Sequence, residues 1–255
     1  MTEYFEFLRH PQPELRARAD TLAMSFGGDA TQSLMSRQRP FDLELVYTRT
    51  MMGFLLFQPV PRRILMIGLG GGSLAKFCHR NLPQAQVTVV EINPHVIATR
   101  SQFLIPEDDE RLQVLLADGA DFVAASDARF DVVLVDGFDD KGACAQLGSQ
   151  AFYRHCHACL SDAGVLVANL DTEHPEHELW LQRLGAAFLG NSVAVEVPDR
   201  RNRIAFAGKG PALEGSQSSL DRAIAALPMA ARAQLLPELQ RLSARACRDA
   251  PRHPV

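Results

Sequence analysis

The sequence predicts one large α/β domain built on a doubly wound, mostly parallel sheet. Three observations support this fold class: short and nearly unbroken apolar runs, longer helical stretches between them, and a glycine-rich segment directly after the first run. The runs that we interpret as strands are residues 64–67, 87–90, 112–116, 132–135 and 165–168. Unbroken apolar strands are typical of a parallel sheet with helices on both faces, and strand–helix alternation produces that arrangement.

The elements around these strands follow from their patterns in chain order. Segments 21–26 and 31–35 flank a glycine turn and predict a hairpin, after which a helix is expected through 43–56. Helices are predicted between the strands at residues 73–81, 94–103, 149–161 and 176–189. Segments 192–197 and 203–207 predict a closing pair of strands.

The last part of the chain differs in composition from the rest. Residues 208–219 are rich in Gly, Pro and Ser and predict a linker, and two short helices are expected after it, the second with leucines at helical spacing. We therefore expect three parts: an N-terminal hairpin and helix region over 1–58, the α/β domain over 59–210, and a C-terminal helical appendage over 211–255.

Composition excludes several classes of function. With 26 basic and 30 acidic side chains, the net charge of −4 provides no general attraction to nucleic acid or to an anionic membrane. The acidic N-terminus lacks a signal-peptide pattern, and the apolar stretch 51–57 is far shorter than the roughly 20 residues of a membrane span. We expect a cytoplasmic protein without nucleic-acid or membrane partners.

Cysteine and histidine usage raises the question of a metal site. The five cysteines, an odd number, do not indicate a disulfide framework. His155, Cys156, His157 and Cys159 form one local cluster inside a predicted helix. Structural zinc usually takes four ligands from two pairs well separated in sequence, and only one pair is visible here. We therefore expect no metal.

The first predicted strand runs directly into the glycine loop, which we define as residues 68–73, Gly-Leu-Gly-Gly-Gly-Ser. Glycines allow the sharp turns that bring a ligand close to main-chain N–H groups at the start of a helix. Dinucleotide-binding enzymes share such loops, and Ser73 stands where their third glycine would be. The loop alone therefore indicates a nucleotide or nucleoside without choosing between them.

Two acids at strand ends narrow the choice. Glu91 follows the second strand, where a carboxylate accepts both ribose hydroxyls of a nucleoside. Asp118 follows the third strand, where an acid suits the exocyclic amine of adenine, a place that nicotinamide enzymes use less. The pair predicts a bound adenosine, most simply that of a sulfonium donor.

The fourth strand ends in three further carboxylates, Asp136, Asp139 and Asp140. Their mutual repulsion is costly unless a cation or a proton offsets it. At this edge they would face the positively charged sulfur of the donor. Such a carboxylate also accepts a proton from an incoming ammonium and frees the lone pair for attack.

Together these segments resemble the spermidine and spermine synthases, the aminopropyltransferases, over about residues 32–207. The resemblance is carried by the glycine loop, residues 90–97, 117–119, 130–136 with Asp139, and 151–153 leading into 162–167. It implies a Rossmann-like fold of the class I S-adenosylmethionine-dependent methyltransferase type. It also implies S-adenosylmethionine or its decarboxylated form as co-substrate, a small amine acceptor, and a homodimer.

The resemblance assigns roles to individual residues. It implies Glu91 on the ribose, Asp118 on the adenine, and Asp136 as proton acceptor, with Asp139 and Tyr47 completing the catalytic set. The donor-binding set that it implies is Gln32, Gly68, Gly70, Gly71, Glu91, Ile92, Asp118, Gly119 and Asp136.

Departures from the family pattern leave the reaction open. Family members usually carry an acid where Gly71 stands, and Gln or His and then Glu where Thr48 and Arg49 stand. A Pro-Thr-Tyr-Pro-like segment is replaced by residues 198–203, Pro-Asp-Arg-Arg-Asn-Arg. Fewer acids and more arginines suit a donor that still has its carboxylate. Aminopropyl transfer is therefore the first hypothesis, methyl transfer from S-adenosylmethionine the second, and nucleoside binding without turnover the third. An NAD-dependent oxidoreductase is a weaker fourth, since the sequence shows no hydride-transfer constellation.

Overall fold

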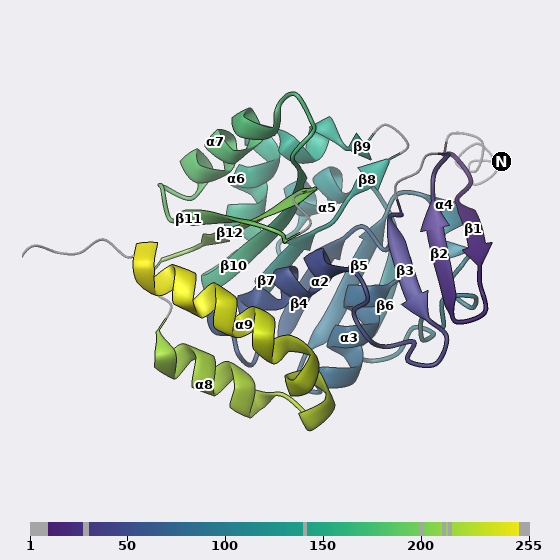
Figure 1. Cartoon of the computed structure of the whole chain (residues 1–255). Helices are drawn as coiled ribbons and strands as arrows, with labels where there is room; N and C mark the ends of the chain where they lie inside the picture. The colour runs from purple at the N-terminus through teal and green to yellow at the C-terminus, as the bar shows by residue number, and fades with distance from the viewer. Residues whose placement is uncertain are drawn as a thin grey trace, which may run out of the picture.

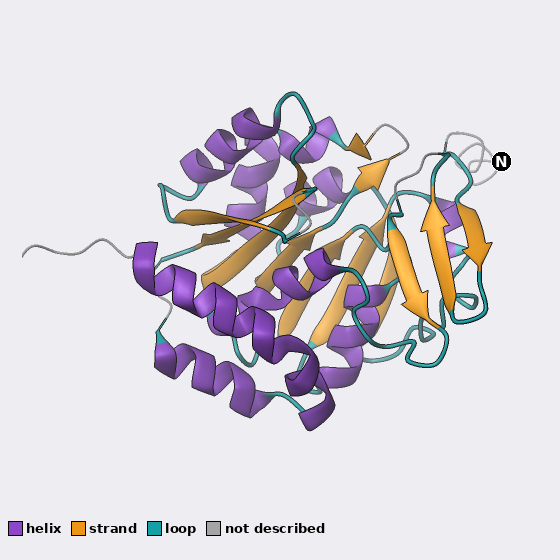
Figure 2. Cartoon of the chain, in the orientation of Figure 1, coloured by secondary structure: helices purple, strands orange, loops and turns teal. Residues whose placement is uncertain are grey.

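The computed structural model describes residues 10–27, 31–139, 142–198, 201–210, 213 and 216–249. Its centre is a seven-stranded sheet in the order β11-β12-β10-β7-β4-β5-β6, which Figures 1 and 2 show obliquely. The strands are β4 (Arg63–Ile67), β5 (Gln86–Glu91), β6 (Leu112–Leu116), β7 (Phe130–Val135), β10 (Leu160–Asp171), β11 (Ser192–Glu196) and β12 (Asn202–Gly208). The pairs among β10, β7, β4, β5 and β6 are parallel, and β12 pairs antiparallel with β10 and β11.

Helices cover both faces of this sheet, as the unbroken apolar strands predict. Alternate residues of β4 enter two separate apolar cores: Ile64 and Met66 face one, and Leu65 and Ile67 face the other. The first core receives side chains from α3 (Ser73–Asn81), and the second from α5 (Gly119–Ala125), α6 (Gln150–Cys159) and α7 (His177–Ala187). The doubly wound, mostly parallel sheet is thus confirmed, as is the closing strand pair β11 and β12.

The N-terminal region forms a separate small sheet beside the main one (Figure 1). The predicted hairpin is present as β2 (Thr21–Ser25) and β3 (Ser33–Ser36), and β1 (Glu14–Ala17), which the sequence did not indicate, adds a third antiparallel strand. The helix expected through 43–56 is shorter: α2 (Val46–Met51) passes into a 3₁₀ turn, η1 (Met52–Leu56).

The C-terminal region consists of α8 (Gln217–Ala226) and α9 (Met229–Asp249). The second of the two expected short helices is therefore a long one, and it continues through Pro237. Its buried leucines pack on α2 and η1, and Gly53 lies so close to Leu242 that a Cβ atom there would meet its Cδ1 at 2.5 Å. The division into three parts stays a prediction. The three parts share one apolar core, which includes residues of β2, α2, the main sheet and α9.

Two further predictions need correction. The helix expected over 94–103 is only α4 (Pro94–Ile97), and hydrogen-bonded turns follow up to Leu104, which has a positive φ of 55°. Not every apolar strand is covered on both faces, since Leu115 and Leu116 of β6 are 37% and 47% exposed. β6 is an edge strand with β5 as its single partner in the sheet, so its cover is incomplete.

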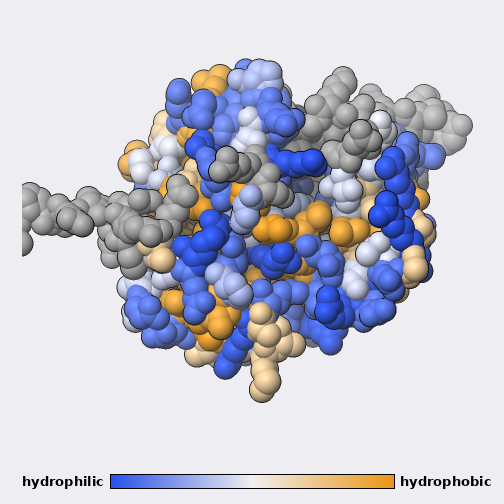
Figure 3. Space-filling model, in the orientation of Figure 1, coloured by the Kyte–Doolittle hydropathy of each residue, from blue (hydrophilic) through white to orange (hydrophobic). Residues whose placement is uncertain are grey.

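The described part of the chain has a mainly hydrophilic surface on one face and no membrane-spanning helix. On the face in Figure 3, hydrophilic residues dominate and apolar ones gather in a few patches. Among the described helices, none is long and apolar enough to cross a membrane.

Candidate active site

A cleft of about 550 Å³ opens at the carboxyl end of the central strands. Its wall is formed by residues from the glycine loop, from β3 and the segment before it, from α2, and from the ends of β7 and β10. Because parallel strands bring their carboxyl ends to one edge, segments far apart in sequence meet there, as in other open α/β sheets.

Asp136, the residue directly after β7, lines this cleft. One carboxylate oxygen accepts a hydrogen bond from the Tyr47 hydroxyl at 3.2 Å, and the other accepts one from the Asn169 amide at 2.9 Å. Burial raises the pKa of Asp136, although the bonds from Asn169 and Tyr47 oppose that shift. Burial and the nearby Asp136 charge also raise the pKa of Tyr47, which therefore stays a hydroxyl donor.

Two asparagines extend this network, and the sequence analysis missed both. Asn202 at the start of β12 donates to the side-chain oxygen of Asn169 at 2.9 Å, so the Asn169 amide group faces Asp136. Asn169 is 5% exposed, and its neighbours in the buried part of β10, residues 165–168 and 170, are all apolar. A single amide in such a strand is the signal that could have identified it, because buried polar groups need partners.

The glycine loop takes the sharp course that its composition predicts. Gly68, Gly70 and Gly72 have positive φ angles of 94°, 50° and 67°. At Gly68 a Cβ atom would collide with the Asp136 carbonyl oxygen, so glycine there lets the first turn pack against the end of β7. Gly70 lines the cleft, whereas Gly71 does not.

Gly71 is enclosed by neighbouring segments. Its N–H donates to the Ser33 hydroxyl of β3 at 2.8 Å, and a Cβ atom there would lie 2.8 Å from the Phe103 ring. An acidic side chain at this position would therefore require Phe103 to move. Phe103 is itself held in place by Lys76, a buried lysine whose ammonium donates to the Phe103 carbonyl at 2.7 Å.

The two acids predicted to hold the nucleoside lie outside the cleft lining and bind main-chain groups. Glu91, which is 7% exposed, accepts the Leu69 N–H at 2.7 Å and the Asn93 N–H at 2.8 Å. Burial raises the pKa of Glu91, and these backbone bonds oppose the shift. Asp118 caps α5 by accepting the N–H groups of Ala120 and Asp121 at 2.7 and 3.1 Å.

The remaining predicted residues are distributed around this edge. Gln32 lines the cleft, and its carbonyl lies 3.3 Å from the Tyr47 hydroxyl. Ile92 follows β5 with 45% of its surface exposed, and Gly119 is the first residue of α5, close to Ile67. The backbone of Asp139 belongs to β8 (Phe138–Asp139), which pairs with β9 (Gly142–Ala143). The side chain of Asp139 and the whole of Asp140 lie outside the described part of the chain.

The arginines expected to alter the field of the site have different positions. Arg49 does not line the cleft: its guanidinium donates to the Leu43 and Glu44 carbonyl oxygens. Arg203 pairs with Glu178 at 3.1 Å. Arg201 does line the cleft, together with Asp171 and Glu173, two acids that the sequence analysis did not single out. Arg49 therefore does not supply the cleft with a positive charge that would suit a donor with a carboxylate.

The local cysteine cluster does not lie near this cleft. Cys156 and Cys159 are buried in α6, and burial raises the pKa of the Cys159 thiol to about 11. Among the residues that the structure describes, no three His, Cys, Asp or Glu side chains are arranged to hold a metal ion.

Comparison with known proteins supplies the remaining evidence. The spermine/spermidine synthase domain family matches residues 44–186, which include α2, the glycine loop and the ends of β5 and β7. A polyamine aminopropyltransferase of Chromobacterium violaceum is 38% identical over 189 residues, which cover 74% of this chain and 72% of that protein. The chain belongs to the spermine/spermidine synthase family. Like its relatives in this family, it is a transferase.

Solved structures agree on the fold. A probable spermidine synthase from Corynebacterium glutamicum superposes with a TM-score of 0.69 at 21% identity, covering 84% of this chain and 82% of that one. Human methyltransferase-like protein 13, in complex with SAH, superposes with a TM-score of 0.60 at 24% identity, covering 76% and 90%. The fold is thus shared between this family and the class I methyltransferases, as the sequence predicts.

Proposed function

We propose that this protein transfers an aminopropyl group from decarboxylated S-adenosylmethionine to a small amine. One observation carries the proposal: a carboxylate with a raised pKa, Asp136, stands in the cleft between a hydroxyl and an amide that fix both of its oxygens. Membership of the spermine/spermidine synthase family supports the same reaction.

In this proposal, Asp136 prepares the acceptor. An amine that enters the cleft as an ammonium gives one proton to the Asp136 carboxylate, which leaves a lone pair on the nitrogen. That lone pair attacks the propyl carbon attached to the donor sulfur; the nitrogen–carbon bond forms as the carbon–sulfur bond breaks. The bonding electrons stay on sulfur, so the sulfonium becomes the neutral thioether of methylthioadenosine.

The other residues would hold the donor in line for this attack. We assign the ribose to Glu91 and the adenine to Asp118, with Ile92 and Gly119 beside the base. The loop glycines and Gln32 would border the donor chain, and Tyr47 and Asn169 would fix Asp136. Orienting the two reactants in this way accounts for a large part of such a rate enhancement. A homodimer and the absence of a metal are further expectations, and neither enters these steps.

Product analysis tests the proposal directly. The purified protein is incubated with a panel of diamines and either decarboxylated or intact S-adenosylmethionine, and the nucleoside products are separated by chromatography. We expect methylthioadenosine to form with the decarboxylated donor only. Formation of S-adenosylhomocysteine from the intact donor would overturn the proposal in favour of methyl transfer.

Binding without turnover has its own signature. A ligand at about 100 times its dissociation constant stabilises the folded state by roughly 2.7 kcal/mol, which a thermal unfolding curve resolves. If the decarboxylated donor stabilises the protein but no amine in the panel yields a nucleoside product, the protein is a binder rather than a transferase.

A further inference from the structure

The helix that carries Tyr47 depends on its surroundings for its position. α2 has six residues, and its N-cap, Leu45, provides no side-chain hydrogen bond. A helix this short is not stable by itself, because few backbone bonds offset the entropy lost on ordering it. Contacts from other segments must therefore fix where the Tyr47 hydroxyl lies.

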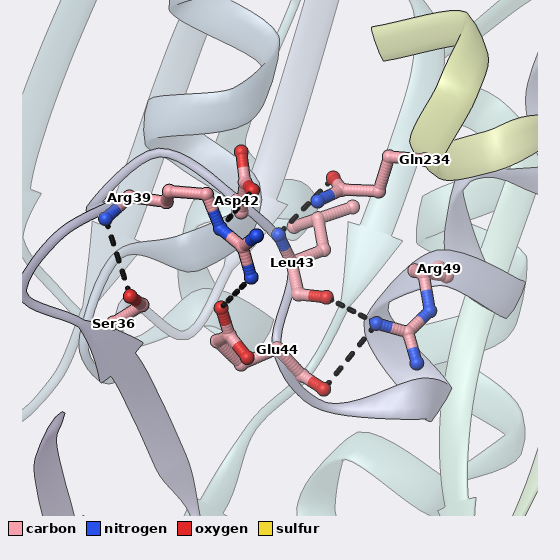
Figure 4. Close-up of polar contacts among 7 residues, drawn as sticks. All are labelled: Ser36, Arg39, Asp42, Leu43, Glu44, Arg49 and Gln234. Carbon is pink, nitrogen blue, oxygen red and sulfur yellow. Dashed lines mark hydrogen bonds and ion pairs between the residues drawn. The ribbon is translucent and has the colours of Figure 1, made fainter. Parts of the chain in front are cut away.

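The first contact is made to the turn just before α2. The Leu43 N–H donates to the side-chain oxygen of Gln234, in α9, at 3.1 Å. Arg49 closes the same turn from within α2 by donating to the carbonyl oxygens of Leu43 and Glu44, as Figure 4 shows. Since Leu45 lines the cleft, the wall of the cleft and α9 are joined through these few residues.

The second contact is made one turn further along α9, near the C-terminal end of α2. The Thr50 hydroxyl donates to the Glu238 carboxylate, which also accepts two hydrogen bonds from Arg241, at 2.8 and 2.6 Å. Burial raises the pKa of Glu238, but the bonds from Arg241 and Thr50 outweigh burial and the pKa is lowered overall. Glu238 therefore remains an ionised acceptor at neutral pH.

Gln234 and Glu238 act on the same side of α9. Residues four apart lie on one helix face, about 6 Å apart along the axis. Leu235 and Leu239, which directly follow these two residues in sequence, are fully buried. Their burial fixes the position of α9 against α2 and η1. The two polar contacts thus tie the short helix α2 to the well-packed helix α9.

We propose that Gln234 and Glu238 are positioning residues for the reaction, holding α2 where the Tyr47 hydroxyl reaches Asp136. The inference rests on the proposed function, in which Asp136 accepts the proton. It assigns the C-terminal helix, about 190 residues from Tyr47 in sequence, a direct part in setting the cleft. Neither residue lines the cleft, so both act through α2.

Three variants of similar side-chain volume test it, Gln234→Leu, Thr50→Val and Glu238→Leu, with Tyr47→Phe as reference, because none of the three new side chains can make these hydrogen bonds. Each should lower kcat on the order of 10- to 100-fold, as small misplacements of reacting groups do. Because the Tyr47 bond lowers the pKa of Asp136, its loss raises that pKa. In a plot of kcat/KM against pH, the acidic limb should then move to higher pH in all of these variants.

Two controls separate positioning from general stability. Gln240→Ala, an exposed position on α9, should change neither rate nor profile. Leu242→Ala removes a buried apolar contact of α9 and should lower the unfolding temperature while leaving the acidic limb in place. Thr50→Val should have little further effect on the limb in the Tyr47→Phe background, because the two act in series.

Outcomes that overturn the inference are distinct from those that overturn the function. If the unaltered protein forms methylthioadenosine but Gln234→Leu, Thr50→Val and Glu238→Leu all leave the acidic limb unmoved, α9 does not position Tyr47. A crystal structure of Thr50→Val decides the point without turnover. The separation of the Tyr47 hydroxyl from the Asp136 carboxylate, 3.2 Å here, should exceed hydrogen-bonding distance, and an unchanged distance refutes the inference.

Discussion

The two halves of the sheet edge hold their acids in different ways. At β7 and β10, Asp136 is held by side chains from distant segments, Tyr47 and Asn169. At β5 and β6, Glu91 and Asp118 are held by backbone N–H groups, those at Asp118 from its own turn and those at Glu91 from residues 69 and 93. One half is an assembly of side chains, and the other is built from the backbone of the loops.

The difference teaches where each half is vulnerable. Backbone donors exist whatever the side chains are, so the β5–β6 half forms as soon as its loops do. The Asp136 network exists only when α2, β10 and β12 are all seated, and it depends on packing at a distance. Substitutions at Asp136 should therefore affect catalysis, whereas those at Glu91 and Asp118 should affect donor binding and local stability.

The largest effect is expected for Asp136→Asn. The amide keeps the shape of the side chain but cannot accept the proton, so kcat should fall about 10²- to 10⁴-fold while the donor still binds. Burial raises the pKa of Asp136, so the native state disfavours the charge and loses stability as pH rises through that pKa. The unfolding temperature of the variant at neutral pH should accordingly be equal or higher.

Asp131→Asn is the matched control for this variant. Asp131 lies near the opposite end of β7 and accepts backbone N–H groups from Arg62 and Arg63. Its removal should reduce stability and leave kcat unchanged. An Asp136→Asn protein with near-normal turnover at saturating substrate would exclude Asp136 as the proton acceptor.

A smaller effect, on affinity, is expected for Glu91→Gln. The amide places an N–H donor where one carboxylate oxygen of Glu91 accepts a hydrogen bond. The variant also lacks the negative charge that would strengthen hydrogen bonds to the ribose. We expect donor affinity, measured by calorimetry, to fall about 10- to 100-fold, the value of one charge-assisted hydrogen bond. The rate at saturating donor should change little.

Asp109→Asn controls for the lost backbone bonds. Asp109 also accepts two main-chain N–H groups, from Arg111 and Leu112, both at 2.7 Å, and it precedes β6, at the end of that strand opposite Asp118. Both variants should lose stability, but only Glu91→Gln should lose donor affinity. Equal donor affinities in the two variants would reduce Glu91 to a support for the loop.

The fold was largely predictable because its signals are local. Each core strand is a short apolar run, and α3 occupies residues 73–81 as expected, since the glycine loop marks its start. α4 was overestimated for the opposite reason. Asn93 and Pro94 mark where it starts, but the residues after Ile97 turn so that Phe103 and Ile105 pack against the glycine loop, and that contact is not visible in the sequence.

The site was predictable only in part, because only some of its features have local signals. The acids at strand ends could be identified because the strands themselves are recognisable in the sequence. Asn169 could not be paired with Asp136, because the two are 33 residues apart and meet only through the parallel register of β10 and β7. Nor could Arg49 be placed from the sequence, because its position does not show that its guanidinium turns back to the Leu43 carbonyl.

The smallest effect, and the finest test of the comparison, concerns Asp118. As the N-cap of α5 it can be replaced by Ser, which caps equally well, whereas Ala costs about 1 kcal/mol and lowers the unfolding temperature by roughly 2–4 °C. A serine hydroxyl is too short to reach an adenine amine as well. If Asp118 also binds the base, Asp118→Ser and Asp118→Ala should lose affinity for methylthioadenosine equally, and neither should lose affinity for its inosine analogue, which lacks the amine. If Asp118→Ser binds methylthioadenosine like the unaltered protein, Asp118 is a helix cap and nothing more.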